Sequence, residues 1–368
     1  MEEVVMQQLF GGTYHGKTVF LTGHTGFKGG WMALWLQQLG AKVVGFSLPE
    51  PPSNPCHFES LGLDMVSLKG DIRNAEEVAT AMQEHQPDIV FHMAAQPLVR
   101  LSYREPVATY ATNVMGTIHV MEAARQCGSV KAFVNITSDK AYENREWAWG
   151  YRESDPMGGY DPYSSSKGCA ELVTSAWRNS YFREAGILMA SVRAGNVIGG
   201  GDWAEDRIIP DIFRAAGAGE KVQVRNPKAI RPWQHVLEPL SGYLQVGQRL
   251  LEGNERFAEA WNFGPANEAA VPVGTLVELC SQHWDAVGME VTSDPNAVHE
   301  ATLLKLDWSK AQLYLGWKPV WGLESTMEIT AAWYRDFYTA SPNPRERTLA
   351  DLERFVSDGR SAGLTWAG

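Results

Sequence analysis

The feature that most constrains the fold is an alternation of short apolar runs with amphipathic stretches over the first half of the chain. Six candidate strands, most of them nearly continuous apolar runs, lie in this half: Thr18–Thr22, Lys42–Phe46, Val66–Lys69, Ile89–Met93, Ala132–Ile136 and Leu188–Val192. Such runs are typical of parallel strands that are buried on both faces. Helical patterns separate them, over Phe27–Leu39, Ala75–His85, Pro106–Gln126 and Pro162–Ala185. The alternation predicts right-handed βαβ units and an α/β fold with a doubly wound parallel sheet.

A glycine-rich loop, GHTGFKG, runs from Gly23 to Gly29 and joins the first predicted strand to the first predicted helix. Glycines at this spacing permit a tight turn, and they let backbone N–H groups and the helix N-terminus approach a pyrophosphate. The strand–loop–helix context favours a dinucleotide site over a simple tight turn. We therefore expect a Rossmann-like sheet that binds NAD through this loop, with contacts from Gly23, Thr25, Gly26, Phe27, Lys28 and Gly29.

Further cofactor contacts are expected where the next three predicted strands end. An acidic residue usually binds the adenosine ribose after the second strand. This chain has the uncharged Ser47 there and no nearby arginine, so we expect NAD rather than NADP, bound with modest affinity. Asp71, beside Ile72, is either an acceptor for the adenine amino group or the N-cap of the helix that starts at Ala75. Small residues that let the cofactor lie close to the backbone follow the fourth strand: Ala94 and Ala95, then Gln96.

The pair Tyr163 and Lys167 lies just beyond the fifth predicted strand, four residues apart. On a helix this spacing places both side chains on one face. A nearby ammonium and the nicotinamide charge favour the phenolate of a tyrosine, which is then able to accept a hydroxyl proton while hydride leaves for NAD. Such a pair is common on surface helices, but together with the glycine loop it predicts a dehydrogenase-type centre.

Three polar residues, Ser138, Asp139 and Lys140, follow the fifth predicted strand directly. Ser138 is expected to hydrogen-bond a sugar hydroxyl. A plain dehydrogenase or epimerase needs only Ser, Tyr and Lys, so the additional acid and base favour an elimination of water. The alternative is a solvated loop with an incidental ion pair.

The composition of the sequence changes after about residue 192, where glycine and proline become frequent and the predicted elements become shorter. We expect an NAD-binding domain over 1–192 and a smaller C-terminal substrate domain over 193–338, interleaved with the first, because open α/β sheets bind ligands at the carboxyl ends of their strands. Residues 339–368 form a C-terminal tail without an interpretable motif.

Composition and charge exclude several classes of protein. The net charge of −11 disfavours a nucleic-acid partner. No apolar run is long enough to span a bilayer, and no signal peptide is evident. The four cysteines show neither metal-site nor CxxC spacing, so we expect no metal, reduced thiols and a cytoplasmic location.

At these motifs the chain resembles the extended short-chain dehydrogenases/reductases, and among them the CDP-glucose 4,6-dehydratases. The resemblance extends from about Lys17 to Tyr338 and includes the segments TGHTGFKGGW, NITSDKAY, GGYDPYSSSKGCAEL and VRAGNVIGGGDWAEDR. Its most diagnostic residue is Lys140, since related dTDP-glucose and GDP-mannose enzymes carry glutamate there.

The resemblance implies a three-step reaction with recycled NAD, and a product that leads to the dideoxyhexoses of bacterial surface polysaccharide such as O-antigen. Tyr163 removes the C4 hydroxyl proton, Lys140 removes the proton at C5, and Asp139 protonates the departing C6 hydroxyl. Lys140 is either that base or a fixed charge that stabilises an enolate, because an ammonium must first lose its proton to act as a base. Asn113 matches the family asparagine that holds the catalytic helix.

The resemblance also implies nucleotide-sugar contacts in the second half of the chain and a homodimer or homotetramer. Arginine suits a diphosphate because its planar fork makes paired charged hydrogen bonds. Asn196 and Arg231 are expected at the phosphates and Arg207 at the nucleoside. The other expected contacts are Arg193, Trp233 and His235. For each of these six residues the alternative is a surface salt bridge or a core position. The alternative activities are dehydration of another nucleotide sugar and 4-epimerisation.

Overall fold

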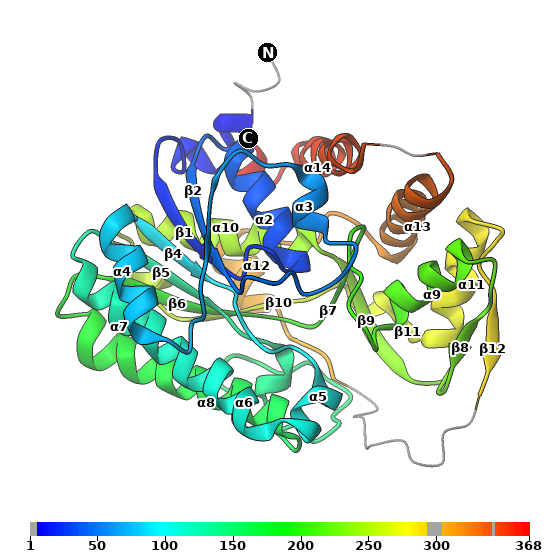
Figure 1. Ribbon diagram of the computed structural model, residues 1–368, viewed down its shortest axis with the longest axis horizontal. Coiled ribbons are helices and arrows are strands. Elements are labelled where there is room, and N and C mark those ends of the chain that lie inside the picture. The colour runs from blue at the N-terminus through cyan, green and yellow to red at the C-terminus, as the bar shows by residue number, and fades with distance from the viewer. Residues whose placement is uncertain (1–5, 293–303, 341–342) are drawn as a thin grey trace.

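A seven-stranded sheet forms the centre of the computed structural model, which describes residues 6–292, 304–340 and 343–368. All strand pairs in this sheet are parallel, in the order β10-β6-β5-β4-β1-β2-β3 (Figure 1). The strands are β1 (Thr18–Thr22), β2 (Lys42–Ser47), β3 (Val66–Lys69), β4 (Ile89–His92), β5 (Ala132–Ile136), β6 (Leu188–Ala194) and β10 (Ala260–Phe263). The predicted α/β fold is confirmed, with β10 as a strand that the sequence pattern did not reveal.

Helices cover both faces of this sheet, as apolar strands buried on two sides require. One apolar cluster joins a face of the sheet to α4 (Ala75–His85), α7 (Thr117–Cys127) and α8 (Pro162–Trp177). A larger cluster covers the other face with α2 (Phe27–Gln38), α10 (Leu237–Leu251), α12 (Ser309–Leu315) and α14 (Pro344–Ser361). Short helices α3 (His57–Leu61), α5 (Val99–Arg104) and α6 (Pro106–Tyr110) lie in the connections.

Two helices that the sequence pattern predicts as continuous contain wider, π-helical turns. One turn (Ala111–Gly116) separates α6 from α7, and the other (Arg178–Phe182) follows α8. The first carries Asn113, whose buried side chain bonds to Ser166 on α8. Insertions of this kind are frequent at functional sites, and this one turns a polar group inward.

A smaller lobe lies beyond the carboxyl ends of the strands (Figure 1). It contains a three-stranded sheet of β7 (Asn196–Ile198), β9 (Ile230–His235) and β11 (Ala270–Pro272), and a two-stranded sheet of β8 (Val222–Val224) and β12 (Met289–Val291). Helices α9 (Ile208–Gly217), α11 (Val273–His283) and α13 (Leu323–Thr339) complete it around a separate apolar cluster. Because β10 and α10 return to the large sheet, the second half of the sequence contributes to both lobes.

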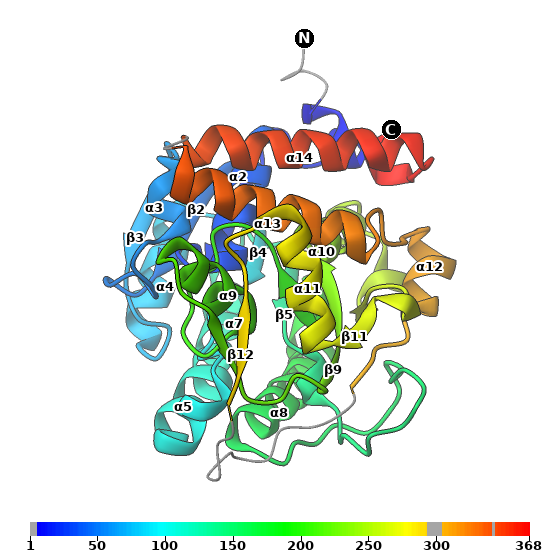
Figure 2. The same cartoon turned by 90° about the vertical axis from the view of Figure 1, so that its right-hand side faces the viewer.

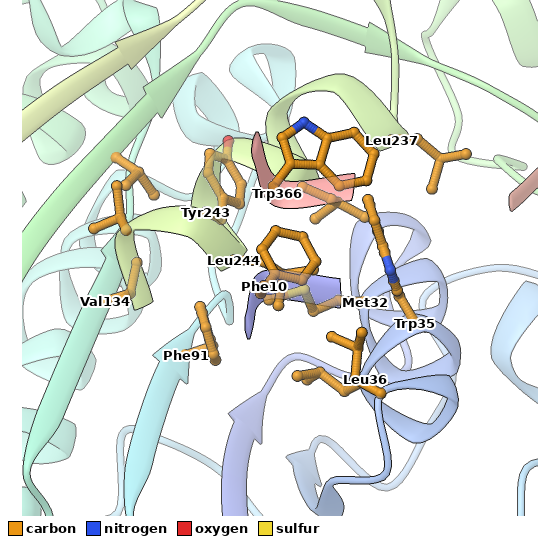
Figure 3. Close-up of a cluster of buried hydrophobic side chains, with 14 of the residues drawn as sticks. Phe10, Met32, Trp35, Leu36, Phe91, Val134, Leu237, Tyr243, Leu244 and Trp366 are labelled. Atoms are coloured by element: carbon orange, nitrogen blue, oxygen red, sulfur yellow. The ribbon is translucent and has the colours of Figure 1, made fainter. Parts of the chain in front are cut away.

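The last 25 residues belong to the core of the larger lobe. Trp366 stacks on Phe10 at 5.5 Å between ring centroids and meets Trp35 edge-on at 5.7 Å (Figure 3). Helix α14 lies across the molecule next to α13, above α2 (Figure 2). Within the described ranges no helix combines the length and apolarity needed to cross a bilayer.

Candidate active site

The first turn of α8 fixes the position of Tyr163. Asp161 caps this helix by accepting a hydrogen bond from the Ser164 backbone N–H at 2.9 Å, and Pro162 occupies the first helical position. Both residues favour a helix start at this point. The backbone N–H of Tyr163 donates to Ser102 Oγ at 3.1 Å, which ties the turn to α5.

Tyr163 and Lys167 lie on one face of α8, and both are almost completely buried. Burial raises the pKa of Tyr163 to about 12, although a hydrogen bond with Ser138 favours the phenolate. Burial also lowers the pKa of Lys167 to about 8, against the attraction of Glu171. The Lys167 ammonium therefore remains the main form at neutral pH, and the cation that lowers the pKa of Tyr163 is Arg207.

The three residues after β5 meet this helix. Ser138 Oγ donates to Asp139 Oδ1 at 2.9 Å and accepts from the Lys140 backbone N–H at 3.2 Å. Burial raises the pKa of Asp139, opposed mainly by the charge of Lys140. Ser138 thus links Tyr163 to Asp139, and the structure brings the predicted redox and elimination groups into one cluster.

The glycine loop has the shape that a pyrophosphate needs. Gly23 adopts a left-handed backbone (φ +74°), and an added Cβ would lie 2.8 Å from the backbone of Ala94. An added Cβ on Gly29 would lie 2.1 Å from the Gly23 carbonyl oxygen. Gly26 precedes α2 without any side-chain cap, so the first N–H groups of the helix remain for a ligand. These residues fit NAD.

Ser47 supports the glycine loop from the end of β2. Its hydroxyl lies 2.9 Å from His24 Nδ1 and accepts from the Thr25 backbone N–H at 3.3 Å. The other nitrogen of His24 lies 2.7 Å from Ser67 Oγ, and burial lowers the pKa of His24 to about 4. A neutral His24 therefore stands beside the position where an acidic residue usually binds the ribose.

Asp71 does not cap α4. Asn74 is the N-cap, accepting from the Glu76 and Glu77 backbone N–H groups, so the capping alternative for Asp71 was wrong. Asp71 pairs with Arg73 at 2.5 Å, and the hydrogen bond from Arg73 lowers the pKa of this carboxyl. The adjacent Ile72 is buried in the sheet cluster. The adenine contact of Asp71 stays a prediction.

The segment after β4 is held by Asn113. Its amide oxygen accepts from the Gln96 backbone N–H at 2.8 Å, and its amide nitrogen donates to the Gln96 carbonyl oxygen and to Ser166 Oγ. Ala94 donates its N–H to Thr22 Oγ1, and Ala95 lies between these two anchors. Asn113 thus connects the expected cofactor segment to α8.

Lys28 belongs electrostatically to the catalytic cluster as well as to the glycine loop. Burial lowers its pKa to about 8, with repulsion from Arg207 and Lys167 in the same direction and attraction by Asp139 and Asp202 against it. The glycine-loop motif predicted a cofactor contact for Lys28, but it did not indicate that Lys28 also lies near Lys167 and Asp139.

Three of the residues expected at the nucleotide sugar lie at the junction with the smaller lobe. Asn196 begins β7, and Arg207 precedes α9 and pairs with buried Asp202 at 3.2 Å. Arg231 is partly exposed on β9, where it donates to the Ile230 carbonyl oxygen. Arg207 influences the pKa of Tyr163, which places its charge near the reacting groups.

The other three expected contacts are buried. Arg193 is 3% exposed and forms an ion pair with Glu171, which favours the salt-bridge interpretation. Trp233 packs in the core of the smaller lobe. His235 is fully buried between Trp31 and Trp321, so the core interpretation is favoured for it also.

Sequence reasoning missed three residues around the catalytic groups. Glu171 follows Lys167 by one helical turn, a spacing that the printed sequence shows. Tyr142 follows Lys140 by two residues and contacts Arg193. Gly195 leaves room for Asp139, because an added Cβ would lie 3.0 Å from its carboxylate. Of these three residues, only Glu171 could have been identified from the sequence, by its spacing from Lys167.

Comparisons with known proteins extend over most of the chain. The family model described as GDP-mannose 4,6 dehydratase matches residues 20–330. A CDP-glucose 4,6-dehydratase from Salmonella typhimurium is 53% identical over 356 residues, which cover 95% of this chain and 98% of that protein.

Two solved structures are similar in fold. A dTDP-glucose 4,6-dehydratase from Bacillus anthracis in complex with NAD superimposes with a TM-score of 0.73 at 21% identity, covering 87% of this chain and 97% of that chain. A UDP-glucose 4-epimerase from Thermotoga maritima with UDP-glucose gives a TM-score of 0.74 at 22% identity, covering 87% of this chain and 99% of that one.

Proposed function

The chain belongs to the GDP-mannose 4,6 dehydratase family of extended short-chain dehydrogenases/reductases, and from this premise we propose that it converts CDP-glucose into CDP-4-keto-6-deoxyglucose and water. The observation that carries the proposal is the position of Asp139 and Lys140 beside the Tyr163–Lys167 pair, joined to it through Ser138. The high identity to a CDP-glucose enzyme supports the cytidine nucleotide.

The glycine loop of Gly23, Gly26 and Gly29 would hold NAD, which when bound would supply a reversible hydride acceptor, so that the reaction would have no net redox change. Tyr163 takes the C4 hydroxyl proton, with the Lys167 ammonium stabilising its phenolate. The resulting 4-ketone acidifies the C5 hydrogen, and we assign its removal to Lys140, which returns a proton to C5 as C6 is reduced. Asp139 donates the proton with which the C6 hydroxyl leaves as water, and its raised pKa suits a proton donor.

The expected nucleotide pocket uses the charges at the junction of the lobes. We assign Asn196 and Arg231 to the phosphates and Arg207 to the nucleoside, because β7, α9 and β9 lie in the smaller lobe at the ends of the large-sheet strands. The product is a 4-keto-6-deoxy sugar nucleotide of the kind that precedes dideoxyhexoses in surface polysaccharide. Free thiols at all four cysteines support a reducing, cytoplasmic location.

A homodimer is supported by apolar side chains on α6, α8 and the π-helical turn that follows each. The exposed residues on this face are Val107, Tyr110, Met115, Leu172 and Tyr181. Exposed apolar patches of this kind mark association sites. Sedimentation should show a dimer that Leu172→Glu converts to monomer, whereas a monomeric native protein would contradict the assignment.

The deciding experiment is incubation of the purified protein with NAD and, separately, the CDP-, dTDP-, UDP- and GDP-hexoses. The 4-keto-6-deoxy product is detected by its near-ultraviolet absorbance in alkali. We expect product from CDP-glucose. A C4 epimer without this absorbance would indicate the epimerase, and product from another nucleotide alone would refute the CDP assignment.

A further inference from the structure

A buried ion pair lies one helical turn behind Lys167. Glu171 on α8 and Arg193 on β6 are 5% and 3% exposed. The guanidinium donates to both carboxylate oxygens, through Nε at 2.7 Å and Nη2 at 2.8 Å. This paired geometry fixes direction as well as distance, so the ion pair sets how α8 lies against β6.

The remaining bonds of Glu171 lead to the catalytic segment. Thr137 Oγ1 donates to Glu171 Oε1, and Ser191 Oγ donates to Oε2 at 2.7 Å. Thr137 directly precedes Ser138, the first residue of the catalytic cluster. Glu171 therefore anchors the start of the segment that carries Asp139 and Lys140.

The remaining bonds of Arg193 lead to the other end of the same segment. Its Nη1 donates to the hydroxyl of Tyr142 at 2.5 Å, and the guanidinium lies 4.9 Å from the centre of the Tyr142 ring. The Tyr142 hydroxyl donates in turn to Asn262 Oδ1 on β10 at 2.8 Å. Tyr142 follows Lys140 by two residues, so the segment is held at both ends by one ion pair.

We propose that Glu171 and Arg193 are positioning residues that hold the elimination groups Asp139 and Lys140 in register with the redox pair on α8. A buried ion pair is a poor source of stability compared with apolar packing, so its value here lies in geometry. Arg193 thus serves the reaction without touching the substrate. The inference rests on the proposed dehydratase function.

The proposal separates two steps of the reaction. Oxidation at C4 depends on Tyr163 and Lys167, which remain fixed by α8 when the segment loosens, and on the segment only through the hydrogen bond of Ser138 with Tyr163. Removal of the C5 proton and loss of the C6 hydroxyl depend on Lys140 and Asp139, which move with the segment. A loosened segment should therefore stop the reaction after oxidation.

The test uses Thr137→Val and Tyr142→Phe, singly and combined, because these changes cut the two links and leave the ion pair intact. Glu171→Gln removes the charge itself and is the variant that risks misfolding. Asp351→Asn is the matched control, since Asp351 is also a buried partner of an arginine (Arg347, 3.0 Å) but lies on α14, away from α8 in both views (Figures 1 and 2).

Each purified variant is assayed with NAD and CDP-glucose for kcat, KM, bound reduced cofactor and solvent deuterium at C5. We expect the double variant to lose about 10- to 100-fold in kcat, as misplacement by about 1 Å does, with little change in KM. Reduced cofactor should accumulate and deuterium incorporation should slow, while Asp351→Asn changes neither.

Four results would overturn the positioning role or the function on which it rests. One is a kcat that falls only in proportion to the folded fraction measured by thermal unfolding. Another is loss of activity without accumulation of reduced cofactor, because oxidation would then be impaired as well. If the native protein forms no product from CDP-glucose, the proposed function itself is wrong. If the native protein is active and the double variant is equally active, only the positioning role is refuted.

Discussion

Replacement of Lys140 distinguishes a base from a fixed charge at the centre of the site. Lys140→Met keeps the aliphatic stem and removes the ammonium. The bond from residue 140 to Ser138 Oγ comes from the backbone N–H, so it survives the change. Lys140 is only half-buried, so the free energy of unfolding should change by no more than about 0.5 kcal/mol.

The effect on the reaction should be much larger. Loss of a general base costs about 100- to 10,000-fold, which corresponds to about 3–5 kcal/mol of activation free energy. Asp139 keeps its role, because the Lys140 charge is the main influence that lowers its pKa against burial. Without that charge the carboxyl holds its proton more firmly and remains a proton donor. The variant should therefore form the 4-ketone and stop.

Lys140→Arg is the control that separates the two roles. Arginine carries the same charge but does not deprotonate in proteins. If Lys140 is the base, both variants should lack solvent deuterium at C5, measured by mass spectrometry of the sugar, while reduced NAD accumulates. Restored exchange in the arginine variant would assign the lysine to electrostatic stabilisation, and normal exchange in the methionine variant would refute both roles.

Three further predictions concern the core, the pH dependence and the nucleotide pocket. Trp366→Ala should lower the free energy of unfolding by about 3–5 kcal/mol through the cavity it leaves in the core, and a loss below about 1 kcal/mol in denaturant titration would contradict this. Burial lowers the pKa of His57 from 6.5 to about 3, so the folded state binds fewer protons and stability falls as pH falls through this window. His57→Phe should reduce that slope by about 1.4 kcal/mol per pH unit, and an unchanged slope in denaturation at several pH values would refute it. Arg207→Met should raise KM for CDP-glucose about tenfold or more through a lost charged hydrogen bond, with kcat less affected, and an unaltered KM would remove Arg207 from the pocket.

The larger sheet was predictable because its signal is local. Each of the six predicted strands is an apolar run flanked by a helical pattern, and the observed strands begin at the predicted residues. The seventh, Ala260–Phe263, has four residues and pairs with β6 across about 65 positions of intervening chain. No helical pattern of the predicted βαβ units leads into this strand, so its place in the sheet depends on tertiary contacts with β6.

The proposed catalytic residues could be located in the sequence for the same reason, whereas the residues that surround them could not. Tyr163, Lys167 and the segment after β5 lie within motifs whose spacing is local. The roles of Arg193 and His235 depend on which side chains surround them in three dimensions. Arg193 lies in a family motif and was therefore interpreted as a ligand contact, whereas the structure pairs it with the buried carboxylate of Glu171. Phe10 and Trp35, two aromatic partners of Trp366, lie near the other end of the chain, so no short stretch of sequence contains them together with Trp366.

The proposed mechanism assigns the chemistry that distinguishes a dehydratase from an epimerase to one short segment of this fold. The sheet, the glycine loop and the Tyr163–Lys167 helix suffice for oxidation at C4, and a structure with a 4-epimerase function has the same fold. Elimination additionally requires an acid and a base that meet C5 and C6 of the same bound sugar. Both come from consecutive residues, Asp139 and Lys140, so their mutual placement is set by the backbone. Their placement relative to Tyr163 is not set by the backbone in this way. A rigid link between this segment and α8 is therefore needed for one reaction cycle to run to completion.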